Sequence, residues 1–102
     1  MALQTPITHK LNSDKNRFEF ELENGKMGIV KYIPLGRKMQ LIHTEVPEEL
    51  RGQGYGTEMI EQTLASIDEM RFKVIPECPF VSAYMDSHPE WDHLRYVTDT
   101  PR

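Results

Sequence analysis

The chain has 102 residues, 38% of them hydrophobic, which is enough for one small domain and no more. Its net charge of -4, with no run of lysine or arginine longer than two, argues against nucleic-acid binding, because a phosphate-backbone binder needs a clustered basic surface. The single cysteine, Cys78, cannot form a disulfide within the chain, so a reducing compartment is the default.

The ends of the sequence set the expected domain boundaries. The first fifteen residues lack the apolar run of a signal peptide, and no later stretch is apolar enough to span a membrane. We therefore expect a cytoplasmic protein without a membrane partner. Residues 1–15 are expected to be a flexible N-terminal segment, residues 16–96 a single domain and residues 97–102 a C-terminal tail.

The first predicted elements are two strands joined by a tight turn. Between residues 17 and 23, apolar side chains alternate strictly with charged ones, which indicates a half-buried strand. Asn24 and Gly25 follow, and both tolerate the positive φ of a type I′ hairpin turn. The returning strand is predicted at residues 27–33, and a second turn at residues 34–36.

A third strand is predicted at residues 38–46, with apolar residues on both of its faces. Regular alternation puts Met39, Leu41, His43 and Glu45 on one face, and Ile42, Thr44 and Val46 on the other. This pattern favours a central strand that is covered on both sides.

The second half of the predicted domain is helical and returns to the sheet. Apolar residues recur at helical spacing over residues 54–70, which predicts an amphipathic helix about 25 Å long. The sequence RFKVI, residues 71–75, predicts a short buried strand, and the crossover length implies parallel pairing. A short helix is predicted at residues 80–87. The predicted fold class is α+β, an antiparallel meander followed by a parallel strand–helix–strand unit.

The turn RGQGYG, residues 51–56, is the strongest candidate for a binding site. The first amides of a helix have no intrahelical partner and the helix dipole is positive there, so a glycine-rich helix entry suits an anion. A Walker phosphate loop is excluded because no lysine follows the glycines. A dinucleotide fingerprint is weakly supported, because Thr57 replaces its last glycine although Glu77 offers its acidic residue. A structural helix entry without a ligand is the remaining alternative.

A third pattern, Arg/Gln-x-x-Gly-x-Gly/Ala, is met by Arg51, Gly54 and Gly56, and it resembles the signature of the GNAT-type acyl-CoA N-acyltransferases. The later sequence VIPECPFVSAYMDSHPEW resembles the short, single-domain branch of this superfamily. That branch has a Pro-x-Cys-Pro-aromatic motif, a His-Pro-Glu-aromatic segment and a strand with a His-Thr pair, which His43 and Thr44 match. The resemblance covers nearly the whole domain and implies a minimal GNAT-like fold.

The resemblance implies an acetyl-CoA-dependent N-acetyltransferase with an amine acceptor, either a small molecule or a protein lysine. The turn would hold the pyrophosphate of coenzyme A, and the end of the third strand would hold the pantetheine arm in a gap between parallel strands. The cofactor-binding residues implied are Thr44, Glu45, Val46, Arg51, Gly52, Gln53, Gly54, Tyr55, Gly56 and Thr57. The tight first hairpin leaves no room for the helices that wall the acceptor site in larger members. We therefore expect an open acceptor site, on a monomer or weak dimer.

Two residues are implied to be catalytic. His43 would be the general base, for which an ordinary pKa near 6.5 is suitable, and Cys78 would lie beside it near the thioester. Without the resemblance, a hydrogen-bonded core histidine is the favoured interpretation of His43, and a small buried hydrophobe is the non-catalytic interpretation of Cys78. Cys78 has two functional alternatives, a covalent nucleophile or an acid for the leaving thiolate. We favour direct transfer with Cys78 lining the site, and Glu45 and Glu77 are reserve bases.

Two other functions are weighed against the acetyltransferase. Cys78, His88 and His93 have the spacing Cys-x9-His-x4-His, and His43 would be a fourth metal ligand. Structural zinc sites normally contain two closely spaced cysteines, which are absent, so we expect no metal. The second alternative is a non-catalytic coenzyme A-binding or interaction module, because the missing acceptor walls are compatible with binding without turnover.

Overall fold

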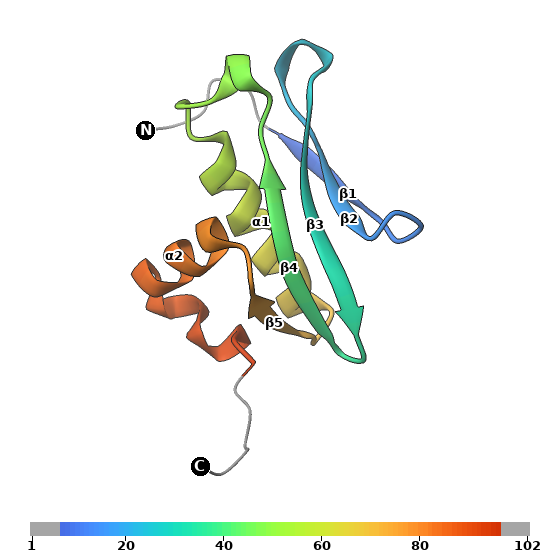
Figure 1. Ribbon diagram of the computed structural model, residues 1–102, viewed down its shortest axis with the longest axis vertical. Helices are drawn as coiled ribbons and strands as arrows, with labels where there is room; N and C mark the ends of the chain where they lie inside the picture. Colours follow the sequence, from blue (N-terminus) through green and yellow to red (C-terminus); the bar gives the residue numbers. More distant parts are fainter. Residues whose placement is uncertain (1–6, 97–102) are drawn as a thin grey trace.

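The computed structural model describes residues 7–96, which form a five-stranded sheet and two α-helices (Figure 1). The predicted C-terminal tail and the first six residues lie outside the described residues. The strands are β1 (Thr8–Asn12), β2 (Arg17–Glu21), β3 (Met27–Leu35), β4 (Lys38–Glu45) and β5 (Lys73–Pro76), and the helices are α1 (Tyr55–Glu69) and α2 (Pro79–Ser87). Short 3-10 segments occur at Glu23–Gly25, Glu48–Leu50 and Pro89–Leu94.

The sheet has the strand order β1-β2-β3-β4-β5, antiparallel throughout except for the parallel pair β4–β5. The α+β fold class and the parallel strand–helix–strand unit are therefore confirmed. The first hairpin turns where expected, because Asn24 and Gly25 both have positive φ, at 60° and 70°. The helix expected at residues 54–70 is α1, and its boundaries differ by one residue at each end.

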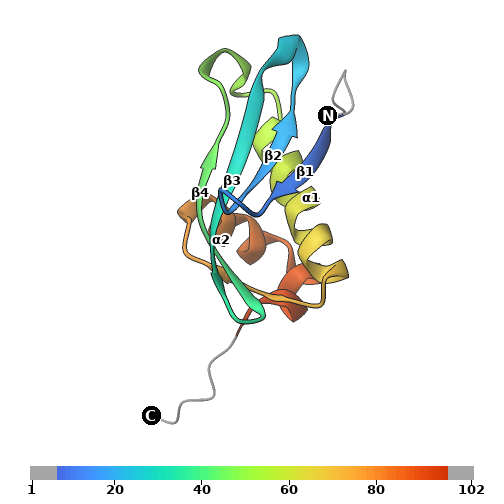
Figure 2. The same ribbon diagram turned by 90° about the vertical axis from the view of Figure 1, so that its right-hand side faces the viewer.

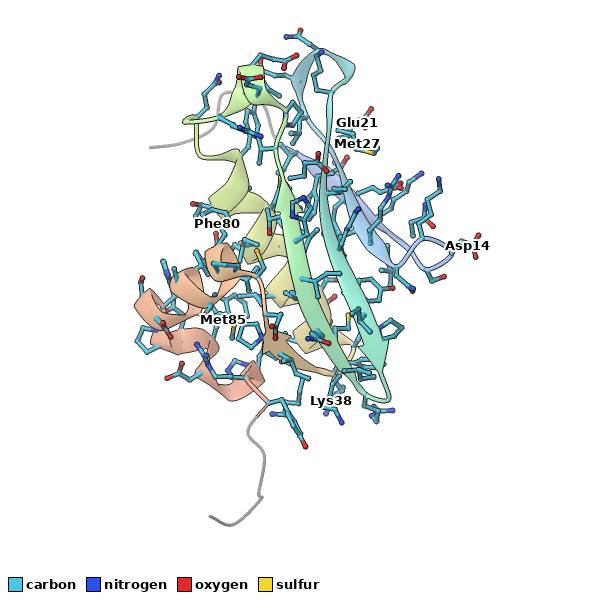
Figure 3. All side chains as sticks on the ribbon, in the orientation of Figure 1. Asp14, Glu21, Met27, Lys38, Phe80 and Met85 are labelled. Atoms are coloured by element: carbon cyan, nitrogen blue, oxygen red, sulfur yellow. The ribbon has the colours of Figure 1, made fainter. Side chains whose placement is uncertain are left out.

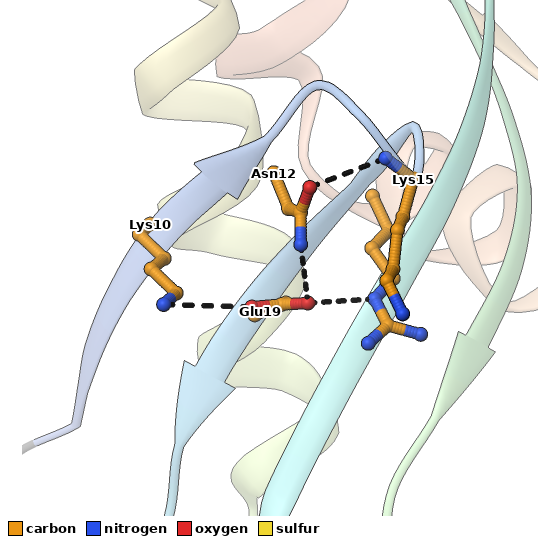
Figure 4. Close-up of polar contacts among 5 residues, drawn as sticks. Lys10, Asn12, Lys15 and Glu19 are labelled. Carbon is orange, nitrogen blue, oxygen red and sulfur yellow. Dashed lines mark hydrogen bonds and ion pairs between the residues drawn. The ribbon is translucent and has the colours of Figure 1, made fainter.

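Strand β1 was not expected from the sequence. Residues 1–15 were placed ahead of the domain, but Thr8–Asn12 pairs with β2 along its whole length at the edge of the sheet. Four of its five side chains are exposed, so the strand carries no alternation of apolar and polar residues. Its polar side chains bond to β2 instead: the Asn12 amide donates to Glu19 Oε2 at 2.9 Å, and Lys10 Nζ lies 3.8 Å from Glu19 Oε1 (Figure 4).

Both helices pack on the same face of the sheet, and one hydrophobic core lies between them and the strands. Figure 2 shows strands β1–β4 side by side across the view, with α1 and α2 behind them. Helix α1 contributes Met59, Ile60, Leu64 and Ile67 to this core, and α2 contributes Val81 and Met85, all with no exposed surface. The opposite face, which we call the open face, is not covered by any helix of the described residues. The prediction that the third strand is covered on both sides was therefore wrong.

A β-bulge in β4 reverses the alternation of its side chains. Lys31 lies opposite His43 and Tyr32 lies opposite Leu41, so Ile42 is an extra residue with no cross-strand partner. Before the bulge, Leu41 faces the core; after it, Thr44 faces the helix side and His43 faces the open face. The prediction that His43 shares a face with Met39 and Leu41 was wrong for this reason.

Candidate functional site

The parallel strands β4 and β5 separate halfway along β4. Their ladder runs from Lys38 opposite Lys73 to Leu41 opposite Pro76 and ends there. Pro76 has no amide hydrogen with which to continue it, and the Cys78 amide donates to the Leu41 carbonyl at 2.8 Å. Beyond this bond, residues 42–45 have no strand partner on the side of β5. The gap expected between the two strands is therefore present.

The glycine turn presents main-chain amides at the start of α1. Gly52 and Gly54 have φ of 80° and 90°, a region that L-residues with side chains rarely adopt. Gly54 is the N-cap, and the first helical bond runs from the Glu58 amide to its carbonyl at 3.1 Å. No side chain of the described residues caps this end of the helix. The amides of Tyr55 and Gly56 therefore remain available for an anion.

The turn and the unpaired edge of β4 line one groove of about 470 Å³. Its walls are formed by Thr44, Val46, Leu50, Arg51, Gly52, Gly54, Tyr55, Gly56, Thr57 and Phe80. Of the ten cofactor-binding residues implied by the sequence, all except Glu45 and Gln53 line this groove. Glu45 is exposed at the end of β4, and the Gln53 side chain donates to the Glu49 carbonyl at 3.4 Å.

Phe80 is a groove residue that was not expected. It is the second residue of α2, lies next to the start of α1 and is 45% exposed (Figure 3). A Cβ on Gly56 would lie 2.9 Å from Phe80 Cε2, closer than real Cβ contacts allow. The Phe80 ring therefore packs directly against Gly56, and a side chain at residue 56 would require this ring to shift. The only sequence signal for Phe80 was its place in the Pro-x-Cys-Pro-aromatic motif.

Two side chains of the turn are already engaged within the protein. Arg51 Nε donates to the Val46 carbonyl at 3.1 Å, which ties the turn to the end of β4. Tyr55 is 2% exposed, and its hydroxyl donates to Glu23 Oε2 at 2.8 Å. This hydrogen bond with the Glu23 carboxylate, together with burial, raises the pKa of Tyr55 above its ordinary value. The side chain of Tyr55 therefore points away from the groove and only its main chain is available there.

Cys78 lies on the helix side of the gap. It is 6% exposed and stands at the N-cap of α2, and its Sγ is 3.7 Å from the Thr44 hydroxyl oxygen. Thr44 belongs to the groove lining, so this pair stands at the end of the groove next to the gap. Either the thiol or the hydroxyl can be the donor in the contact.

His43 lies on the other side of the gap, on the open face. Its side chain is 52% exposed, and its Nε2 is 3.8 Å from Glu45 Oε1. Successive side chains of a strand point to opposite faces, and since Thr44 faces Cys78, His43 points away from it. The structure therefore does not bring His43 and Cys78 together. His43 is not a core histidine either.

The remaining candidates are dispersed. Glu77 is exposed and accepts a hydrogen bond from the Gln40 side chain at 3.2 Å. His88 Nδ1 donates to the Tyr84 carbonyl at 2.7 Å, and His93 Nε2 lies 3.2 Å from Asp68 Oδ2. Over residues 7–96, no three histidine, cysteine, aspartate or glutamate side chains are grouped as metal ligands would be. None of the helices described is long and apolar enough to cross a membrane.

Comparison with known proteins assigns this arrangement to a class. The solution NMR structure of a GCN5-like protein from Staphylococcus aureus matches with a TM-score of 0.66 at 21% identity, covering 90% of each chain. The fold is therefore that of a small GCN5-like protein. A sequence model of the GCN5-related N-acetyltransferases matches residues 17–94. The chain belongs to the GCN5-related N-acetyltransferase family, and this membership supports acetyltransferase activity in general.

Proposed function

We propose that the protein is an acetyl-CoA-dependent N-acetyltransferase that binds the thioester in the groove and accepts an amine from the open face. One observation carries the proposal: the anion-binding amides of α1 and the unpaired edge of β4 belong to the same groove. Thr44, from the strand, and Thr57, from the helix, both line it. A diphosphate joined to an extended arm requires these two features together.

The residues present suit such a ligand. The main chain from residue 52 to residue 57 offers amides to the pyrophosphate, and Arg51 adds a positive charge beside the turn. The free main-chain groups of β4 after Leu41 are suited to the amides of the pantetheine arm. The bound substrate supplies an acetyl group activated as a thioester. We place that thioester in the gap between β4 and β5.

The two faces of the gap suit the two proton transfers of the reaction. The amine nitrogen forms a bond to the thioester carbonyl carbon, and the carbon–sulfur bond breaks. On the open face, His43 takes the proton that the amine loses. On the helix side, the Cys78 thiol and the Thr44 hydroxyl, 3.7 Å apart, are the groups to which we assign donation to the departing thiolate.

The same geometry disfavours a covalent route through Cys78. A cysteine nucleophile normally has an adjacent base, and His43 lies on the opposite face of the sheet. The only side-chain hydrogen-bond partner of Cys78 in the described residues is Thr44, which is not a base. Direct transfer to the amine is therefore the mechanism we propose. The acceptor is a primary amine, either a small molecule or a protein lysine, and we propose a cytoplasmic monomer or weak dimer.

The exposure of His43 favours one alternative. The His43 side chain is 52% exposed, so water has access to it. Catalytic sites usually exclude water, and this access therefore favours a module that binds coenzyme A without turnover. Two measurements distinguish these functions: coenzyme A affinity, and thiol release from acetyl-CoA with a panel of small amines and lysine peptides. The acetyltransferase releases coenzyme A with at least one class of amine. Binding without release across the panel would favour the module, and absence of binding would refute both.

A further inference from the structure

The turn between β2 and β3 contacts the coenzyme A turn from outside the groove. We propose that this hairpin holds the anion-binding turn in its binding shape, with Glu23 and Lys26 as positioning residues. We call these two residues and their partners, Tyr55 and Glu49, the hairpin clamp. The inference rests on the proposed function for the identity of the ligand. Neither Glu23 nor Lys26 lines the groove, so no contact with the ligand is required of them.

The first contact of the clamp is partly buried. Tyr55 is the first residue of α1, and its main chain belongs to the anion-binding end of the helix. Its side chain extends the opposite way, and its hydroxyl donates to Glu23 Oε2 at 2.8 Å. A hydrogen bond to a charged carboxylate is stronger than one between neutral groups. Tyr55 thus joins the first turn of α1 to a hairpin that lies 32 residues earlier in the chain.

The second contact lies on the other side of the glycine turn. Lys26 Nζ is 2.6 Å from Glu49 Oε2, and Glu49 belongs to the 3-10 segment Glu48–Leu50 that precedes Arg51. Both side chains are about half exposed, so this ion pair adds little stability by itself. Its role is to position the chain: the Lys26–Glu49 ion pair fixes the segment before residues 51–54, and Tyr55 fixes the segment after them.

A close approach of α1 to β3 reinforces these contacts. A Cβ on Gly28 would lie 2.6 Å from Met59 Sδ, so a side chain at residue 28 would require the Met59 side chain, in the second turn of α1, to shift. Residues 23, 26 and 28 therefore contact residues 55, 49 and 59, on both sides of the turn at residues 51–54. Two positive-φ glycines would otherwise leave this turn with considerable conformational freedom. Holding it in one shape lowers the entropy cost of binding an anion.

The test compares coenzyme A affinity among variants that leave the main chain of the groove unchanged; Tyr55 lines the groove, but its hydroxyl is bonded to Glu23. Tyr55→Phe and Glu23→Ala each remove one partner of the Tyr55–Glu23 hydrogen bond. We expect each substitution to weaken coenzyme A binding by about three- to tenfold. The double variant should bind coenzyme A as tightly as the weaker-binding single variant does, because the two residues act as a unit. Two substitutions are the matched controls. Tyr32→Phe alters a buried tyrosine away from the turn, and Glu21→Ala alters the last residue of β2, just before the hairpin turn.

A second readout in the free protein separates positioning from general stability. Backbone ¹⁵N order parameters at residues 52–56 should fall in Tyr55→Phe, whereas those at the middle of α1 should remain unchanged. A uniform fall over the whole domain, or unchanged order parameters in the turn, would overturn the clamp. If the wild type does not bind coenzyme A, the proposed function fails, and the order parameters still decide whether the hairpin holds the turn.

Discussion

The Thr44 hydroxyl oxygen lies 3.7 Å from the Cys78 thiol on the helix side of the sheet, while its neighbour His43 lies on the open face. The two residues implied to act in catalysis are therefore on opposite sides of the gap between β4 and β5. This separation is caused by the extra residue Ile42, which shifts every later side chain of β4 to the other face. In the mechanism that we propose, it allows His43 to act as the base for the incoming amine while Cys78 or Thr44 donates to the leaving thiolate.

The position of Cys78 predicts that acetyl-CoA alone leaves no acetyl group on the protein thiol. We expect intact mass spectrometry after incubation with acetyl-CoA to show the unmodified mass at Cys78, because no base is adjacent to the thiol. Cys78→Ser should retain transfer within about tenfold, since a hydroxyl can replace the thiol as a donor beside Thr44. A stable acetyl adduct on Cys78 that disappears in His43→Gln would contradict direct transfer and the assigned faces.

The glycine turn offers a matched pair of substitutions. Gly52 and Gly36 have φ of 80° and 62°, and a Cβ on either would meet no atom within 4 Å, so alanine strains both positions in the same way. We expect each variant to lose about 1–2 kcal/mol of the free energy of unfolding. Only Gly52→Ala should weaken coenzyme A binding, by about tenfold, because Gly36 lies in the distant β3–β4 turn.

Chemical denaturation measures the stability of both glycine variants, and calorimetric titration measures their affinity. An equal loss of affinity in Gly36→Ala would show that binding follows overall stability rather than the shape of the turn. Unchanged affinity in Gly52→Ala would remove the glycine turn from the proposed site.

Much of the fold could be predicted from local patterns. Strict alternation located β2, positive-φ residues located the first hairpin, and helical spacing located α1, because each pattern reflects packing within a short segment. The glycine turn of the groove was predictable for the same reason, whereas the part of the groove along β4 was expected only from the family resemblance. Its amides follow directly from a glycine-rich helix entry, and Thr44 lines it from the strand that leads there.

The features that were missed depend on pairing between segments. Strand β1 is an exposed edge strand whose polar side chains bond to β2, so it has no apolar periodicity. The bulge at Ile42 depends on the register against Lys31 and Tyr32 and leaves no signal in β4 itself. Assigning His43 to a face required that register, so its relation to Cys78 could not be derived from alternation alone. The hairpin clamp likewise joins residues far apart in the chain.

His43 is expected to affect the rate of transfer without affecting stability. Because the side chain is half exposed and its Nε2 lies as far as 3.8 Å from Glu45 Oε1, His43→Gln should change the free energy of unfolding by less than about 0.5 kcal/mol. Loss of a general base should lower the transfer rate by about 10²- to 10⁴-fold, with coenzyme A affinity unchanged. His9→Gln is the control, because His9 is an exposed histidine on the distant strand β1. Equal rates in all three proteins would show that His43 is not the base.

Glu19 predicts how stability depends on pH. Hydrogen bonds from Arg17 and from Asn12 hold the pKa of its carboxyl below the ordinary value of 4.5 (Figure 4). The folded state therefore releases the proton more readily than the unfolded chain does, so the charged carboxylate stabilises the fold. This contribution is fully present above pH 4.5 and is lost as the pH falls through the lower folded-state pKa. The free energy of unfolding, measured between pH 7 and pH 3, should consequently fall more steeply in wild type than in Glu19→Gln. Glu21→Gln, on the same strand, should keep the wild-type slope, and a Glu19→Gln slope equal to wild type would show that this cluster does not couple β1 to the sheet.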